Sequence, residues 1–333
     1  MAEKIAVLGA GAWGTALAIL LARRGHAAIL AVRRREQLEQ MSAARENAAH
    51  LPDVAIPDHL ILTDSWREAV SDASMVVVAI PSRYARASIA EVASAIAGES
   101  IVVSATKGIE EDSLATMTTM LAEIAPQARA YAALSGPGFA AEVARGKPAA
   151  LVAASTAEAA AREVQSLFAM PMLRIYSSTD VVGVELAGAA KNVIAIAAGI
   201  SDGLELGSSA RAAVITRGLA EIARLVEAAG GKRETVMGLA GMGDLVLTCT
   251  GELSRNRSLG LKIGRAGRFE LAPTRDGASI AEGIVNARSI RSLAARHGIE
   301  MPIVEAVHRA LYEGEPAQAM VGGLLSRALK AEF

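Results

Sequence analysis

The N-terminal stretch 5–14 constrains the fold more than any other part of this sequence. It begins with the apolar run 5–8, continues with the pattern G-x-G-x-x-G at Gly9, Gly11 and Gly14, and leads into a helical run. In that pattern the first glycine permits a tight turn, the second lets the backbone approach a pyrophosphate, and the third lets the helix pack on the strand. The N–H groups and the positive dipole end of the helix attract phosphates. The stretch therefore predicts a dinucleotide-binding unit of Rossmann type.

The same stretch has an alternative interpretation. Residues 5–22 carry no charge, as in a signal peptide or a membrane anchor. However, three glycines and Thr15 interrupt the run, a single basic residue, Lys4, precedes it, and Arg23 and Arg24 end it. This patterning favours the core of a soluble protein, and we expect no membrane insertion.

Composition excludes several classes of protein. The 333 residues suffice for two domains, and 52% hydrophobic with 21% charged residues exclude general disorder. A formal net charge of −1 offers no global field for nucleic acid or an anionic membrane. The single cysteine, Cys249, excludes an intramolecular disulfide and suits a reducing cytoplasm. No Cys/His cluster has the spacing of a metal site, so we predict no metal.

Residues 27–32 predict a second strand, which ends at the basic run Arg33, Arg34 and Arg35. Near this point a Rossmann fold that prefers NAD carries an acidic residue for the ribose hydroxyls, whereas an arginine accommodates the 2′-phosphate of NADP. The run therefore favours NADP, or the use of both cofactors. The alternative is that it forms only the solvated start of a helix.

The remainder of the first half alternates strands and helices, as βαβ units require. Apolar runs predict strands at 74–80, 101–104, 131–134, 149–154 and 173–176, with helices at 82–97 and 113–124. The pattern predicts an α/β fold with a doubly wound, mostly parallel sheet in a domain of residues 1–178. From residue 179, helical stretches at 180–201, 209–229, 254–265, 279–297 and 302–313 predict a second, mainly α-helical domain up to residue 333.

Two loops of the first domain are candidate ligand sites, because ligands bind beyond the carboxyl ends of parallel strands. Lys107 directly follows the strand at 101–104, where a nicotinamide and a substrate would meet. The alternative is that Lys107 is an ordinary exposed lysine in a loop. Gly136, Pro137 and Gly138 follow another strand and either contact a ligand with their backbone or form a simple turn.

Lys191 is the candidate proton-transfer group. Its neighbours three, four and seven positions away on the predicted helix carry no charge, so no salt bridge on that helix explains it. Burial of an ammonium group lowers its pKa, and a lysine in that state exchanges protons near neutral pH. The alternative is a lysine at the rim of an apolar helix, with its charged end in solvent.

Two further segments carry candidate residues. Glycines at 238–243 interrupt the helical pattern around a single acid, Asp244, which by itself could be no more than a helix cap. Ser254 predicts an N-cap with Arg255 and Asn256 in the first turn. Free N–H groups, a guanidinium and an amide donor together suit a phosphate monoester, although a polar helix start would have the same sequence.

With these motifs, the chain resembles the bacterial-type NAD(P)-dependent glycerol-3-phosphate dehydrogenases over nearly its whole length. The motifs that carry the resemblance lie at 9–18, 79–82, 105–110, 135–137, 185–193, 241–245 and 248–257. Many enzymes share the first motif, but few share the others in this order and spacing, and the last is the most specific.

The resemblance implies a role for each matching residue. Lys191 accepts the proton of the C2 hydroxyl of sn-glycerol 3-phosphate, Lys107 contacts substrate and cofactor, and Asp244 orients the reacting end. The implied substrate contacts are Lys107, Gly136, Gly138, Lys191, Asp244, Ser254, Arg255 and Asn256. The implied cofactor contacts are Gly9, Gly11, Trp13, Gly14, Arg33, Arg34, Lys107, Ala140, Arg255, Ile280 and Glu282. Gly138 stands where the family often has serine, so backbone or water must replace a hydroxyl contact.

The implied reaction is hydride transfer between NAD(P)H and dihydroxyacetone phosphate, which supplies glycerol 3-phosphate for phospholipid synthesis. The resemblance also implies a cytoplasmic enzyme that forms a homodimer. One alternative is a related dehydrogenase of β-hydroxyacids or sugar acids, which would need a carboxylate clamp and gives no reason for the cluster at 254–256. Another is a non-catalytic dinucleotide sensor, whose cofactor binding would not depend on Lys191.

Overall fold

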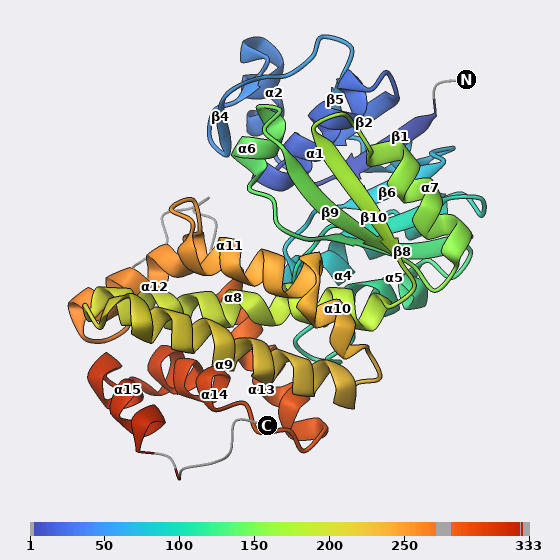
Figure 1. Ribbon diagram of the computed structural model, residues 1–333. Helices are drawn as coiled ribbons and strands as arrows, with labels where there is room; N and C mark the ends of the chain where they lie inside the picture. Colours follow the sequence, from blue (N-terminus) through green and yellow to red (C-terminus); the bar gives the residue numbers. More distant parts are fainter. Residues whose placement is uncertain (1–2, 271–280, 327, 329–333) are drawn as a thin grey trace. The chain divides into compact units, whose positions relative to one another are not determined.

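The computed structural model describes residues 3–270, 281–326 and 328 (Figure 1). The chain forms two compact units, Met1–Glu185 and Leu186–Phe333. Helix α8 (Val181–Gly203) contains the boundary between them. The domain boundary at 178/179 stays a prediction.

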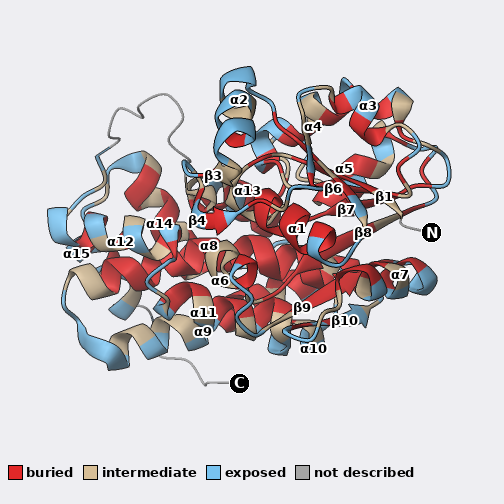
Figure 2. Cartoon of the chain, turned by 90° about the horizontal axis from the view of Figure 1, so that it is seen from above, coloured by how far each residue is buried: buried red, intermediate tan, exposed pale blue. Residues whose placement is uncertain are grey.

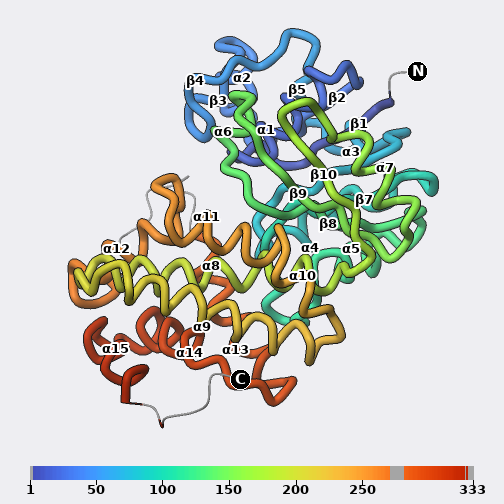
Figure 3. The backbone as a smooth tube through the Cα atoms, viewed as in Figure 1, coloured from blue at the N-terminus to red at the C-terminus, as the bar shows by residue number. Residues whose placement is uncertain are grey.

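The first unit contains a mostly parallel sheet, as predicted. Within the described residues it has eight strands in the order β10-β9-β8-β7-β6-β1-β2-β5, and only the β8–β9 pair is antiparallel. The strands are β1 (Lys4–Leu8), β2 (Ala27–Ala31), β5 (Ile61–Thr63), β6 (Met75–Val78), β7 (Ile101–Ser104), β8 (Ala130–Ser135), β9 (Ala149–Ala154) and β10 (Leu173–Ser178). β9 and β10 run side by side at one edge (Figure 3).

Helices cover both faces of this sheet because its central strands are apolar on both sides. Alternate residues of a strand point to opposite faces, and Ile5 and Val7 of β1 join one core cluster while Ala6 and Leu8 join the other. The first face carries α1 (Ala12–Arg23), α6 (Ala140–Ala144) and α7 (Glu158–Phe168); the second carries α3 (Trp66–Val70), α4 (Ser82–Ala90) and α5 (Met117–Ile124). The buried centre of the sheet is red in Figure 2. A doubly wound sheet follows.

Two predicted helices of this unit are shorter than expected. The stretch 82–97 forms α4 and then a separate 3-10 turn, η1 (Ala93–Ala95), because Val92 leaves the helical region with φ −120°. The stretch 113–124 becomes helical only at Met117, since Leu114 adopts a left-handed φ of 61°. The helix start considered as an alternative at Arg33–Arg35 is borne out by α2 (Arg35–Ala44). The short hairpin of β3 (Glu46–Asn47) and β4 (Leu51–Ala55) was not predicted.

The second unit is helical, as predicted. Besides α8, its described helices are α9 (Gly207–Ala228), α10 (Arg233–Met237), α11 (Asp244–Thr250), α12 (Arg255–Ala266), α13 (Glu282–Arg296), α14 (Pro302–His308) and α15 (Ala317–Leu325), with π-helical turns η2 (Leu239–Gly243) and η3 (Arg309–Glu313). The first predicted residues of α13, 279 and 280, lie outside the described residues.

The expectation that glycines at 238–243 break the helical pattern is confirmed only at Gly238, which is extended and ends α10. The rest of the segment is not a loop: it forms the π-helical turn η2, which leads directly into α11. A Cβ atom at Gly241 would overlap the carbonyl group of Val236. Glycine is therefore needed there for close packing of the backbone rather than for a loop.

Helices α8 and α12 touch through their backbones. Cβ atoms at Gly199 or Gly203 of α8 would overlap carbonyl groups of α12, and Cβ atoms at Gly260 or Gly264 of α12 would overlap carbonyl groups of α8. Within the described residues, α8 is also the one helix long and apolar enough to cross a membrane, but 94% of its apolar window is buried inside the protein. It is a core helix.

Candidate active site

The glycine turn between β1 and α1 is open at the position expected for a pyrophosphate. Gly9 has φ +109°, and a Cβ atom there would lie 2.6 Å from the carbonyl oxygen of Ala79. A Cβ atom at Gly14 would overlap the carbonyl oxygen of Gly9, so α1 packs directly on the turn. Gly11 is the N-cap of α1 and has no atom within 4 Å of its Cβ position. The first turn of α1 thus has no side-chain cap and is accessible to an anion.

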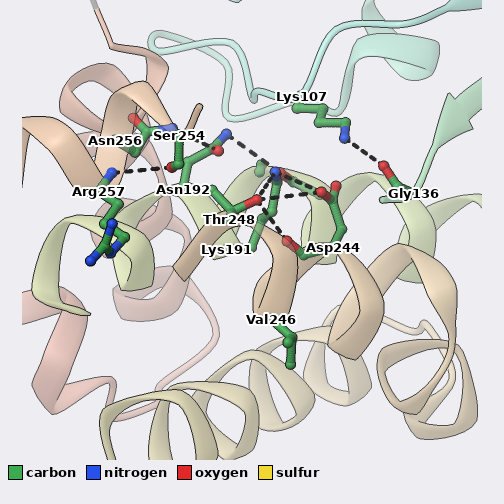
Figure 4. Close-up of polar contacts among 12 residues, drawn as sticks. Lys107, Gly136, Lys191, Asn192, Asp244, Val246, Thr248, Ser254, Asn256 and Arg257 are labelled. Atoms are coloured by element: carbon green, nitrogen blue, oxygen red, sulfur yellow. Dashed lines mark hydrogen bonds and ion pairs between the residues drawn. The ribbon is translucent and has the colours of Figure 1, made fainter. Parts of the chain in front are cut away.

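Lys107 lies beside the glycine-proline loop. Its Nζ donates a hydrogen bond to the carbonyl oxygen of Gly136 at 2.9 Å (Figure 4). Gly136 has φ +124°, and a Cβ atom there would lie 3.0 Å from Cα of Leu151. The loop conformation therefore requires glycine at this position.

Trp13 and Gly138 are neighbours. A Cβ atom at Gly138 would lie 3.6 Å from Cη2 of Trp13 but only 3.3 Å from Cγ2 of Val143 and 3.4 Å from Cδ2 of Leu151. A serine here would therefore need small shifts of these side chains. Ala140, another implied cofactor contact, is the first residue of α6.

The basic run after β2 divides between two roles. Arg34 is the N-cap of α2 and is exposed, as the interpretation of a solvated helix start expects. Arg33 instead forms a bidentate pair with Glu91, at 2.6 and 2.9 Å, and its guanidinium carbon lies 5.5 Å from the ring centroid of Trp66. The hydrogen bonds of this pair raise the pKa of Arg33 and lower the pKa of Glu91. Sequence reasoning missed Glu91, which lies far away along the chain.

Lys191 and Asp244 form a buried ion pair in the second unit (Figure 4). Nζ of Lys191 lies 2.8 Å from Oδ1 of Asp244, and the two side chains are 7% and 2% exposed. The structure thus excludes the alternative of a solvent-reaching lysine. It also brings together two residues that lie 53 positions apart.

Thr248 is a third member of this cluster that sequence reasoning missed. Its hydroxyl donates to the backbone carbonyl of Asp244 at 2.6 Å and accepts a hydrogen bond from Nζ of Lys191 at 2.6 Å. Residues four positions apart share a helix face. That spacing from Asp244 on α11 is the signal by which Thr248 could have been found.

The start of α12 combines a helix cap with a polar network. The side chain of Ser254 accepts a hydrogen bond from the backbone N–H of Arg257, which makes Ser254 the predicted N-cap. The amide of Asn256 donates to Oδ1 of Asn192 at 2.9 Å and accepts from the N–H of Gly283 at 2.9 Å. Asn256 therefore links the start of α12 to α8 and to the start of α13.

The two arginines of this helix start differ. Arg257 donates two hydrogen bonds to Oδ2 of Asp202, at 2.9 and 2.6 Å, and is thereby held against the end of α8. Arg255 is exposed. Of the two arginines, Arg255 is therefore the more exposed to solvent.

Glu185 of the motif before Lys191 has a structural partner. Its buried carboxylate accepts a hydrogen bond from the N–H of Thr118 at 3.0 Å and another from the hydroxyl of the same residue, so it caps α5. Burial raises the pKa of Glu185 despite these hydrogen bonds.

The remaining predicted positions concern the cofactor and metals. Glu282 is the first residue of α13, whereas Ile280 lies outside the described residues. In the described part of the chain, no group of three His, Cys, Asp or Glu residues has the arrangement of a metal site.

A Rossmann-type unit with an open glycine turn, together with a helical unit that buries a lysine–aspartate pair, defines a two-domain dehydrogenase. Comparison with known proteins gives the family. Residues 4–161 match the model of the NAD-dependent glycerol-3-phosphate dehydrogenase N-terminus, and residues 180–322 match that of the C-terminus. The chain therefore belongs to the NAD-dependent glycerol-3-phosphate dehydrogenase family.

Individual relatives span the whole chain. Glycerol-3-phosphate dehydrogenase [NAD(P)+] from Geobacter sp. (strain M21) is 50% identical over 100% of this chain and 99% of its own. The protein of the same name from Koribacter versatilis is 46% identical, over 99% of each chain. A crystal structure of glycerol-3-phosphate dehydrogenase from Coxiella burnetii superposes with a TM-score of 0.91 at 38% identity, covering 98% of this chain and 99% of that one.

Proposed function

We propose that this protein catalyses hydride transfer between NAD(P)H and dihydroxyacetone phosphate, forming sn-glycerol 3-phosphate, and the reverse reaction. The observation that carries the proposal is the buried Lys191–Asp244 pair in a chain that is 50% identical to a glycerol-3-phosphate dehydrogenase [NAD(P)+]. A buried ion pair is expensive to maintain for stability alone. Its presence beside a hydroxyl group favours a chemical role.

The residues around the glycine turn suit a dinucleotide. The open position at Gly11 and the uncapped start of α1 would hold the pyrophosphate, and Trp13, Gly138 and Ala140 form an adjoining surface. The bound nicotinamide supplies the hydride chemistry. The contribution of the protein is to bind, orient and exchange a proton.

Lys191 is the proposed proton carrier. Asp244 and Thr248 fix its Nζ through hydrogen bonds of 2.8 and 2.6 Å, so the ammonium group cannot swing freely. In the direction of reduction Lys191 gives a proton to the substrate oxygen, and in oxidation it takes the proton back. Lys107, held by the carbonyl of Gly136, is proposed from the family resemblance to contact substrate and cofactor.

Ser254, Arg255 and Asn256 are proposed to hold the phosphate end of the substrate. The start of α12 offers backbone N–H groups and the exposed guanidinium of Arg255. Binding energy from this remote group can then hold C2 in the geometry of reaction.

The finer properties are proposals of the same kind. Arg33 and Arg34 after β2 support a preference for NADP over NAD. The single, buried Cys249 suits a reducing cytoplasm, where the product would supply phospholipid synthesis. We expect a homodimer from the resemblance alone.

The deciding experiment is the initial rate of cofactor oxidation with dihydroxyacetone phosphate, comparing NADPH and NADH at equal concentration. Fast oxidation of either supports the proposed reaction, and a faster rate with NADPH supports the role of the arginines. If neither cofactor is oxidised, the proposed substrate is wrong, and the same assay with β-hydroxyacids tests the alternative.

A further inference from the structure

Two side-chain amides converge on one backbone carbonyl in the glycine turn. The carbonyl oxygen of Ala10 accepts a hydrogen bond from Nε2 of Gln37 at 2.9 Å and another from Nδ2 of Asn47 at 3.0 Å. Gln37 lies on α2 and Asn47 on the hairpin strand β3, so two elements outside the βα unit reach back to its turn.

Asn47 is built into this position. Its side chain is buried, with the residue only 1% exposed, and Nδ2 also donates to the hydroxyl of Thr15 at 2.8 Å. Both neighbouring groups are acceptors here, which fixes the NH₂ end of the amide toward the turn. In the described part of the chain Oδ1 of Asn47 has no hydrogen-bond partner. Burying an amide oxygen without a hydrogen bond lowers the stability of the fold, so the two hydrogen bonds donated by Nδ2 must supply the reason for an asparagine at this position.

The consequence for the turn follows from peptide geometry. The described chain has no cis peptide bond, and in a trans peptide the C=O and N–H groups point in opposite directions. With the carbonyl of Ala10 directed toward Gln37 and Asn47, the N–H of Gly11 is directed away from them. That is the open side of the turn, where a Cβ atom at Gly11 would meet nothing within 4 Å.

We propose that Gln37 and Asn47 are positioning residues for the cofactor pyrophosphate. They hold the peptide between Ala10 and Gly11 so that its N–H faces the phosphate oxygens before the dinucleotide binds. Asn47 also ties the turn to Thr15 in the first turn of α1. The inference rests on the proposed dinucleotide binding and assigns no contact of either side chain with the cofactor.

The test uses Gln37→Met, which removes the donor but keeps the length and the partly buried side chain. The matched control is Gln40→Met on the same helix, since Gln40 is exposed and donates a hydrogen bond to Glu36 of the same helix, at 3.4 Å. The measurements are the Kd of NADPH and of NADH by fluorescence titration, and kcat and KM with dihydroxyacetone phosphate. We expect Gln37→Met to raise both Kd values roughly three- to tenfold, with kcat at saturating cofactor unchanged.

The pattern of results separates positioning from general destabilisation. Loss of folded protein lowers kcat and leaves the Kd of the remaining molecules unchanged, which is the opposite of the expected result. The inference is overturned if Gln37→Met binds both cofactors as tightly as the wild type, or if Gln40→Met weakens binding equally. Asn47→Leu should weaken binding by about tenfold or more; if it does not fold, Gln37→Met alone decides. Wild-type protein that binds neither cofactor would overturn the proposed function itself.

Discussion

Nζ of Lys191 lies 2.8 Å from Oδ1 of Asp244, and neither side chain is more than 7% exposed. The hydroxyl of Thr248 completes the contact at 2.6 Å from the same nitrogen. A charge that is buried against an opposite charge depends strongly on that partner. Mutations of this pair can therefore test separately its effect on kcat and its effect on the free energy of unfolding.

Lys191→Met should strongly reduce turnover and spare cofactor binding. Because the proposed proton carrier is lost, we expect kcat to fall by roughly 10²- to 10⁴-fold. The Kd of NADPH, measured by fluorescence, should stay within about twofold of the wild type. A variant that keeps its kcat would show that Lys191 is not the proton carrier.

The same variant should unfold more easily, and a second mutation should restore its stability. Lys191→Met leaves the carboxylate of Asp244 buried without this partner, at a cost of about 3–5 kcal/mol in the free energy of unfolding. Adding Asp244→Leu removes the unpaired charge, so urea denaturation should show most of this loss recovered, while kcat stays low. A double variant no more stable than the single one contradicts this account of the pair.

Arg255→Ala should act on the phosphate end of the substrate. We expect the KM for dihydroxyacetone phosphate to rise by roughly tenfold or more, since a charge-assisted hydrogen bond contributes about 1.5–3 kcal/mol. The rate with unphosphorylated dihydroxyacetone should not change. Arg265→Ala, an exposed arginine in the last turn of the same helix, is the matched control. An equal loss with both substrates would argue against phosphate binding by Arg255.

Glu91→Gln should shift the cofactor preference toward NADPH. The two carboxylate oxygens of Glu91 accept hydrogen bonds from Nη1 and Nη2, so Glu91 occupies that edge of the Arg33 guanidinium. A 2′-phosphate must compete with this carboxylate and is repelled by its charge. We expect the ratio of kcat/KM for NADPH to that for NADH to rise by a few-fold, as for other exposed ion pairs. An unchanged ratio would mean that Arg33 does not contact the 2′-phosphate.

Cys249 should be inert in the folded protein. Burial raises the pKa of its thiol to about 12, so almost no thiolate exists near neutral pH. Alkylation by iodoacetamide should therefore be slow in the native protein and fast in urea, and the signal is unambiguous because the chain has one cysteine. Rapid labelling of native protein would contradict this burial.

The raised pKa of Cys249 also gives a pH dependence with a definite sign. The unfolded thiol loses its proton at lower pH than the folded one, so this contribution to stability is complete below the ordinary pKa and declines as pH rises toward about 12. Cys249→Ala should show a smaller loss of stability over this alkaline range. Identical pH profiles would contradict the assignment.

The parts of the fold that sequence patterns predicted are those governed by local rules. Apolar runs such as 101–104 formed strands, because a strand that is buried on both faces of a parallel sheet needs apolar residues at every position. The glycines at 9, 11 and 14 specified the turn. By contrast, the glycines at 238–243 have a local pattern that suggests a loop. Their helical state depends on the close approach of Gly241 to Val236, which no local rule contains.

The candidate site divides in the same way. Lys191 was conspicuous because a lysine with no charged neighbour on an apolar helix is rare, but its partners depend on how α8 and α11 pack. Glu91, Gln37 and Asn47 belong to none of the sequence motifs. Their contacts with Arg33 and with the carbonyl of Ala10 join residues that only the folded chain brings together.

The glycine contacts between α8 and α12 set the distance between these two helices. Lys191 lies on α8, and the proposed phosphate-binding residues begin α12, whose backbones meet at Gly199 and Gly260 without intervening side chains. The spacing of the two helices that carry the proposed proton carrier and the proposed phosphate site is therefore fixed by contacts between their backbones. We therefore expect a phosphorylated ketone with one carbon more between its carbonyl and its phosphate to be a poorer substrate than dihydroxyacetone phosphate, because the two helices cannot move apart to fit it.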